Sequence, residues 1–418
     1  MKNYFKTISH FSLIVFSLAL MVSCSDDDSV EPKPPVVELL PPVLLACDYF
    51  SEDRVLKNDT LRPVDYIIDC WASVQGGLKI EPGVVIEFEN HAGLYVAPKN
   101  KIFEIKGTEE EPVVLSGTSK QKGYWRGIFF AEAHNQNNLI EHAQIKYAGS
   151  QNLTTSSPIY EGTLALRGVS GTPPQALTLN SVEISNGGSI GLDFHGIRKN
   201  APVTTSNLVI TANEDVPVKV SAEMAHVFNN TSSYAGNASD YLNITTSYYE
   251  IQDQTVSWQK LDVPYLVDNR VHIKHNGHLT IEAGVEMQFK PEGYLQPYDG
   301  STDAGNELSL KIQGMPNDPV YLKAYNGTNW GGIMFGFTQE NNIISHAIIE
   351  NAKGDFPVGN RVNTGAIYLH AQPMLTVENT IFKDLQNCAF YGYGTDPFEN
   401  VTVGNLTFNN VGSQYCNP

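Results

Sequence analysis

The residue types that could do chemistry gather at one place in the first half of this sequence: Asp193, His195, Arg198 and Lys219. A carboxylate, an imidazole and two cationic side chains are groups that take part in general acid–base catalysis. Asp193 and His195 are two residues apart, which puts both on one side of a strand, as a site would need. An Asp/His pair on a turn-rich surface is also common in proteins without activity. We therefore weigh these four catalytic candidates against a purely structural role.

Aromatic residues offer a second kind of site. The chain has 20 Tyr, 18 Phe and 4 Trp, and pairs such as Tyr248-Tyr249, Tyr391/Tyr393 and Tyr294/Tyr298 could form platforms on which sugar rings stack. Packing within the fold is the alternative for each pair. Two weaker candidates are the acidic run Glu109-Glu110-Glu111, most simply a solvated loop, and Asp299 with Asp303, which lie in a Gly/Ser/Asp loop.

These residues are positioned by a unit of roughly two hundred residues that occurs twice. Leu78-Lys79-Ile80-Glu81-Pro82-Gly83-Val84 returns at Leu279-Thr280-Ile281-Glu282-Ala283-Gly284-Val285, an offset of 279 − 78 = 201. Trp125 and His142 return as Trp330 and His346, with offsets of 205 and 204 (330 − 125 and 346 − 142). A catalytic His would hardly be needed twice, so we interpret the repeated residues as structural.

Within each unit, apolar and polar residues alternate at period two in short runs, and Gly, Pro and Asn recur between these runs. Since no helical stripe follows the N-terminus, we predict an all-β chain. Stacked coils of strands, a solenoid, explain the recurrence; a pair of β-sandwiches is the alternative. We divide the chain into a first half over residues 46–234, with an N-terminal lead-in, and a second half over residues 235–418, with a C-terminal cap.

Four motifs connect this pattern to a known fold: Leu-x-Ile-Glu-Pro-Gly-Val, Pro-Val-x-Leu, Trp-x-Gly-Ile-x-Phe and Asn-x-Ile-x-His/Tyr-Ala-x-Ile. Their combination over about residues 60–415 resembles the right-handed parallel β-helix lipoproteins of Bacteroidota, within the pectate-lyase-like superfamily. The resemblance implies a right-handed parallel β-helix built from two homologous halves. It leaves activity open, because that superfamily holds lyases, hydrolases, adhesins and proteins without activity. Its polysaccharide lyases use Ca²⁺ held by carboxylates, with Arg or Lys as base.

The N-terminus predicts export. Residues 1–23 combine the basic Lys2 and Lys6 with an apolar core too short to span a membrane, as in a secretory signal. They end at Leu20-Met21-Val22-Ser23-Cys24, which resembles a bacterial lipobox, in which the Cys is acylated. An ordinary signal with a chance Cys is the alternative. We expect acyl chains on Cys24 to anchor the protein to the outer membrane.

Residues 24–45 predict a lipidated, Pro-rich tether. Its Ser25-Asp26-Asp27-Asp28 resembles the export tag of surface lipoproteins in Bacteroidota, the alternative being a solvated acidic spacer. Asp28-Ser29-Val30 and Asp59-Thr60-Leu61 resemble the O-glycosylation acceptor of these bacteria, which makes Ser29 and Thr60 modification candidates. We therefore expect a lipid-anchored protein exposed on the cell surface.

Four further cysteines suggest two disulfides in an exported protein, with three pairings open. The local choice joins Cys47 to Cys70 and Cys388 to Cys416, one bond at each end of the repeat array. No clustered Cys/His spacing indicates a zinc site.

The formal net charge of −18, with no basic cluster, argues against nucleic acid or an anionic lipid surface as partner. We favour a non-catalytic scaffold or adhesin that binds a polysaccharide or an outer-membrane protein and needs no cofactor. The alternative is a Ca²⁺-dependent polysaccharide lyase centred on the four candidates.

Overall fold

The alternation of residue types in the sequence reappears as alternating burial. In β5 (Leu78–Ile80) both ends are buried and the central Lys79 is exposed. Parallel pairing then stacks inward side chains on one another, and Ile80 lies level with Ile105 of the next coil. Both isoleucines are 1% exposed or less. The interior is thus filled by apolar columns that run through the stacked coils.

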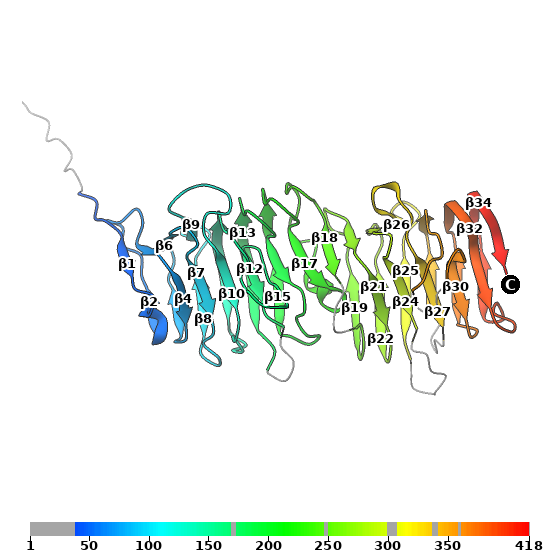
Figure 1. Ribbon diagram of the computed structural model, residues 1–418, viewed down its shortest axis with the longest axis horizontal. Coiled ribbons are helices and arrows are strands. Elements are labelled where there is room, and N and C mark those ends of the chain that lie inside the picture. The colour runs from blue at the N-terminus through cyan, green and yellow to red at the C-terminus, as the bar shows by residue number, and fades with distance from the viewer. Residues whose placement is uncertain are drawn as a thin grey trace, which may run out of the picture. The chain divides into compact units, whose positions relative to one another are not determined.

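The computed structural model describes residues 38–168, 173–245, 250–298, 307–336, 342–357 and 361–417. Leu39–Pro418 form one compact unit. Its described elements are β-strands and three short 3-10 helices, η1 (Tyr49–Ser51), η2 (Ala222–Val227) and η3 (Tyr325–Gly327). The strands pair in parallel and follow one another in chain order along the long axis of this unit (Figure 1). The predicted all-β class is confirmed: this is a parallel β-helix.

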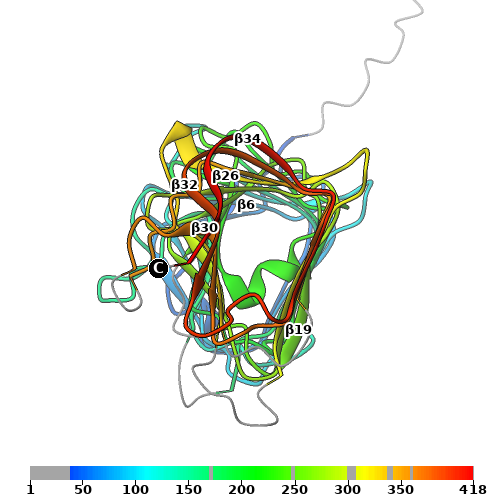
Figure 2. The same cartoon turned by 90° about the vertical axis from the view of Figure 1, so that its right-hand side faces the viewer.

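Each coil has three faces, which we call faces I, II and III; seen along the stack, the coils overlie one another around one closed outline (Figure 2). Face I contains β2 (Arg54–Leu56), β5, β8 (Phe103–Lys106), the first parts of β11 (Leu139–Lys146) and β13 (Leu177–Ser185), β15 (Val203–Ser206), β19 (Gln254–Trp258), β22 (Gly277–Ile281), β25 (Ser309–Gln313), β28 (Asn342–Ser345), β31 (Leu375–Glu378) and β33 (Val401–Gly404).

Face II contains β1 (Val43–Leu45), β3 (Tyr66–Ile68), β6 (Val85–Phe88), β9 (Val113–Gly117), the second parts of β11 and β13, β16 (Val209–Thr211), β20 (Tyr265–Val267), β23 (Glu286–Phe289), β26 (Val320–Ala324), β29 (Ala347–Glu350) and the first parts of β32 (Ile381–Tyr393) and β34 (Thr407–Cys416). Face III contains β4 (Trp71–Val74), β7 (Gly93–Val96), β10 (Gly127–Phe130), β12 (Leu164–Leu166), β14 (Leu192–Phe194), β17 (Val218–Ser221), β18 (Leu242–Thr245), β21 (Arg270–Ile273), β24 (Tyr294–Pro297), β27 (Gly332–Gly336), β30 (Gly365–His370) and the ends of β32 and β34.

Residues that the two halves share perform the same structural task. Trp125 stacks on Phe88 at 4.2 Å between ring centroids, and Trp330 stacks on Phe289 at 4.0 Å. Each indole N–H donates to a backbone carbonyl, at 2.7 Å for Trp125 and 2.8 Å for Trp330.

The repeated histidines lie at corners between face I and face II. His142 and His346 both have left-handed backbone, with φ of 45° and 49°. The carbonyl of each approaches a glycine of the preceding coil, Gly107 or Gly314, so closely that a Cβ there would lie 2.2 or 2.1 Å from the oxygen. Backbone geometry at the corner therefore accounts for the matching glycines.

The helix η2 lies where face I would have its next strand, between β15 and β19 (Figure 2, green helical turn). Thr205 of β15 donates to the carbonyl of Val227 in η2 at 2.5 Å. Face I is therefore divided into two sheets, and at this level the strand ladder continues from β17 through β18 to β20.

Disulfides join Cys47 to Cys70 and Cys388 to Cys416, with Cα–Cα distances of 6.0 and 6.1 Å. This is the local pairing, and each bond ties the first or last coil to its neighbour. Across the described part of the chain, we find no helix with the length and apolar character that crossing a membrane requires.

Candidate functional site

Asp193 and His195 meet, as their spacing predicts, but the carboxylate is completely buried. Asp193 Oδ2 accepts the backbone N–H of Glu161 at 3.1 Å, and Oδ1 lies 2.5 Å from His195 Nδ1. The His195 ring in turn stacks on Tyr160 at 4.5 Å. Both oxygens are thus engaged in holding a loop, and neither faces solvent where a Ca²⁺ ion or a substrate would bind.

Lys219 lies level with Asp193 on the next coil, and its ammonium forms an ion pair with Glu161 Oε1 at 3.3 Å. Arg198 is half-buried in the segment after β14. The structure therefore brings three of the candidates, Asp193, His195 and Lys219, to the loop that contains Glu161. The contacts of these three describe a support for that loop.

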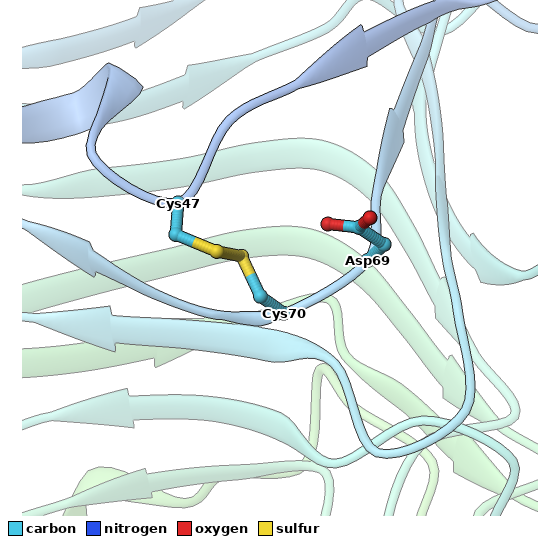
Figure 3. Close-up of side chains that lie close together, drawn as sticks. All are labelled: Cys47, Asp69 and Cys70. Atoms are coloured by element: carbon cyan, nitrogen blue, oxygen red, sulfur yellow. A yellow bond between two sulfur atoms is a disulfide. The ribbon is translucent and has the colours of Figure 1, made fainter.

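Among the described residues, one group of potential metal ligands comes together: Cys47, Asp69 and Cys70, with ligand atoms within 4.8 Å of one another. Figure 3 shows that the two sulfur atoms are bonded to each other beside the Asp69 carboxylate. A disulfide offers no thiolate, and one carboxylate does not make a metal site.

Thr60 lies in an exposed turn, next to Asp59, whose Oδ1 accepts the N–H of Leu61 at 3.1 Å. Cys24, Ser29, Asp299, Asp303 and the pair Tyr248-Tyr249 lie outside the described residues.

A row of aromatic rings runs along the outer side of face III in the first half. Neighbouring centroids lie 6.3 Å apart from Trp71 to Tyr95, 5.9 Å from Tyr95 to Phe129 and 5.5 Å from Phe129 to Tyr160. The row then reaches the His195 ring. Trp71 and Tyr95 are partly exposed, whereas Phe129 and Tyr160 are each 1% exposed.

The loop between β11 and β12 folds over this row, and its hairpin is closed by the N–H of Leu153 donating to the carbonyl of Tyr160 at 2.7 Å. Beneath it lies a cavity of about 390 Å³. The cavity is lined by aromatic, hydroxyl and guanidinium groups: Trp71, Tyr95, Arg126, Phe129, Leu153, Thr154, Thr155, Ser156, Ser157, Pro158, Tyr160 and Arg167. A second cavity of about 600 Å³ shares Tyr95 and includes Lys99 and Lys101. The two cavities adjoin at this tyrosine.

Arginines complete what we call the first aromatic site: Trp71, Tyr95, Phe129, Tyr160, Arg126 and Arg167. The Arg126 guanidinium lies 4.3 Å from the Trp71 ring centroid. It donates to the Asn152 carbonyl at 2.7 and 3.0 Å, and burial lowers its pKa. Arg167 is exposed and makes no ion pair within the described residues. Flat rings, hydroxyls and an available guanidinium together suit a sugar ring that carries an acidic group.

The same face of the second half has a different set of rings, the second aromatic site: Tyr298, Tyr368, Tyr391, Tyr393 and Arg361. Tyr368 lies 5.6 Å from Tyr391 and 6.4 Å from Tyr393, nearly parallel to both. Arg361 lies 4.3 Å from the Tyr393 centroid, and a hydrogen bond with Tyr393 raises its pKa. The Tyr368 hydroxyl is buried without a hydrogen-bond partner in the described structure, and burial raises its pKa.

Strand register corrects one sequence match. The sequence pattern suggests that Asp193-Phe194-His195 corresponds to Ala389-Phe390-Tyr391. In the structure Leu164 pairs with Leu192, and the corresponding Ile367 pairs with Phe390. Asp193 therefore corresponds to Tyr391, and His195 to Tyr393. The sequence match aligns the two phenylalanines Phe194 and Phe390, whereas the register aligns Phe390 with Leu192.

Sequence reasoning found Tyr298, Tyr391 and Tyr393 but missed the whole first aromatic site. The signal that would have identified it is an aromatic residue at an outward position of successive face III strands. Tyr95 and Phe129 are such residues, and they pair directly.

Comparison with known proteins adds no relative: no family model, no curated protein and no solved structure matches this chain.

Proposed function

We propose that this protein is a non-catalytic glycan-binding scaffold, displayed on the cell surface by a lipid anchor. The observation that carries the proposal is the first aromatic site, a cavity of about 390 Å³ with ring faces, hydroxyls and arginines. Aromatic faces bind the apolar faces of sugar rings, and the polar groups set their orientation.

The contacts of Asp193 support a non-catalytic function over the lyase alternative. A lyase needs carboxylate oxygens free to hold Ca²⁺ and a cation near the substrate. Here the buried Asp193 is engaged by Glu161 and His195, and Lys219 is paired with Glu161.

Binding is tested by retention of the purified ectodomain in gels containing acidic or neutral polysaccharides. We expect Trp71→Ala and Tyr95→Ala each to weaken retention roughly 5- to 10-fold, the amount that one aromatic contact contributes. Tyr321→Ala is the control, since Tyr321 is 39% exposed on face II. Retention by none of the polysaccharides, together with crosslinking of Trp71-site residues to an outer-membrane protein, would replace the glycan with a protein partner.

Activity is tested in the same samples, with and without Ca²⁺, by the ultraviolet absorbance of unsaturated sugars. We expect no product. Product that disappears in Arg198→Ala or Lys219→Ala would establish the lyase instead.

The proposed location on the cell surface rests on the sequence motifs that resemble β-helix lipoproteins of Bacteroidota. We expect Cys24→Ala to release the protein from membranes. Replacing Asp26, Asp27 and Asp28 by Ala should leave it anchored but protected from added protease; continued protease access would remove the export-tag interpretation. Intact-mass measurement shows whether Ser29 or Thr60 carries a glycan.

A further inference from the structure

Resting on that proposed function, we propose that one linear acidic glycan bridges the two aromatic sites on face III. The protein would then bind long chains of its ligand by two contacts at once, and short chains by one.

The two sites occupy equivalent places in the halves. In each half one loop leaves face II, folds over face III and enters the next face III strand, from β11 to β12 and from β29 to β30. A backbone hydrogen bond joins the two sides of each loop: Leu153 N–H donates to Tyr160 O in the first, and Phe356 N–H donates to Arg361 O in the second, both at 2.7 Å. In the end-on view the described parts of both loops lie on the same side of the stack (Figure 2, teal and orange).

The charges at the two sites favour an acidic ligand. Arg126, Arg167 and Arg361 make no ion pair within the described residues. Elsewhere in the unit Arg54 and Arg270 pair with carboxylates, at 3.5 and 3.4 Å. The chain has a net charge of −18, yet these arginines lie beside aromatic rings and have no carboxylate partner. Such guanidinium groups would recognise carboxylate or sulfate on a sugar.

The spacing of the sites is set by the coils. From β12 to β30 the stack passes through β14, β17, β18, the coil of β20 and β21, β24 and β27, which makes seven steps; at the fourth step β18 pairs with β20 of face II and not with β21. At about 4.8 Å per step the sites lie roughly 34 Å apart. Parallel pairing holds the coils at this spacing within each half, and the pairing of β18 with β20 joins the halves, so an extended chain of that length would reach from one site to the other.

The surface between the sites does not oppose such a chain. A cavity of about 330 Å³ lies there, and two of the carboxylates that line it, Glu161 and Asp268, are paired with Lys219 and Lys290 at 3.3 and 2.7 Å. The third carboxylate of this lining, Asp215, accepts the backbone N–H of Val216 at 2.8 Å, so lysines neutralise two of the three carboxylates at this cavity.

Calorimetric titration with size-defined oligosaccharides tests the bridge. We use oligogalacturonates for carboxylate, heparin-derived oligosaccharides for sulfate and cello-oligosaccharides as the neutral series. In at least one acidic series, chains longer than roughly 34 Å should bind about 100-fold tighter than short ones. Long chains should bind at one per protein, and short chains at two.

Arg167→Ala and Arg361→Ala should each reduce the affinity for long chains to that for short chains, whereas Lys106→Gln, an exposed cation on face I, should not. Acidic chains that bind with no increase at any length, or a long-chain affinity that survives Arg361→Ala, would overturn the bridge and leave the single-site function intact. Tighter binding of the neutral series would overturn the acidic ligand. Absence of binding by every series would reject the proposed function itself.

Discussion

At the scale of single residues, the interior of this solenoid depends on polar side chains that complete the backbone. Asn138 and Asn342 are buried at matching corners before face I. Asn138 Oδ1 accepts the N–H of Phe103 at 2.9 Å while its amide donates to Ala176 O at 3.1 Å. Asn342 repeats the arrangement with Leu310 N–H and Met374 O, both at 2.8 Å. Each asparagine thus bridges three successive coils.

Asn138→Ala should lower the free energy of unfolding by about 2 kcal/mol or more, because it leaves a buried N–H and a buried carbonyl unpaired. Urea denaturation measures the loss. The neighbouring exposed Asn137→Ala is the control and should change stability by less than about 0.5 kcal/mol. Equal effects of the two substitutions would contradict the bridging role.

His370, beside the second aromatic site, should make stability depend on pH. Burial, and then the positive charge of Arg361, lower its pKa below the ordinary 6.5. The folded protein therefore favours the neutral ring, and the stability that this group contributes is complete above pH 6.5 and falls as the pH drops below it. His370→Gln should flatten the stability profile between pH 7.5 and 5.5 (roughly this window), and Arg361→Ala should flatten it in part. An unchanged slope in His370→Gln would contradict this assignment.

At the scale of elements, face III strands place most of the rings, and a loop supplies Tyr160 to the first aromatic site. The first loop is held from below by Asp193, which accepts the Glu161 N–H, and by His195, which stacks on Tyr160. The residues that seemed best suited to catalysis therefore support the loop over the first aromatic site.

Asp193→Asn should loosen this loop, because the substitution removes the negative charge that strengthens its buried hydrogen bonds. The apolar core is unchanged, so the solenoid should stay folded. We expect a loss of about 1–3 kcal/mol in stability, faster hydrogen exchange over residues 150–161 and weaker glycan binding. Asp318→Asn, at an exposed ion pair with Lys260 in the second half, is the control. Exchange that rises equally across face III in Asp193→Asn would argue for a general role in the core.

Sequence reasoning reached the elements more easily than the site. Period-two alternation and the repeated Trp125 and Trp330 predict stacked strands, because every coil must bury the same side of each strand. The first aromatic site escaped because its rings come from coils of unequal length: Trp71, Tyr95, Phe129 and Tyr160 are separated by 24, 34 and 31 residues. Such spacing shows no period, and only strand register brings the rings together.

At the scale of the whole unit, each coil contacts chiefly its neighbours, so stability is a sum of local terms. The ends lack one neighbour and are closed by disulfides across 23 and 28 residues. The bonds thus reinforce the coils that the array supports least.

Replacing Cys47 and Cys70 by Ser should cost about 3 kcal/mol, from the greater freedom of the unfolded loop. Hydrogen exchange should increase in β1 to β4 and remain unchanged beyond β12. The Cys388/Cys416 double variant should show the mirror result in β32 to β34. Exchange that increases uniformly along the chain would contradict local stapling.

The place of η2 in face I has a mechanical consequence. This short helix occupies the position of a strand, so the hydrogen-bond ladder of face I is interrupted there. The ladder of face II continues at this level through the isolated bridge between Val209 and Ser233. Among the described residues, the ladder through β17, β18 and β20 is the one that crosses this level unbroken. Under tension applied at the two ends, the unit should behave as two stiff springs in series, joined by one weak link. Force would be released at that link first, so one half can unfold while the other stays folded.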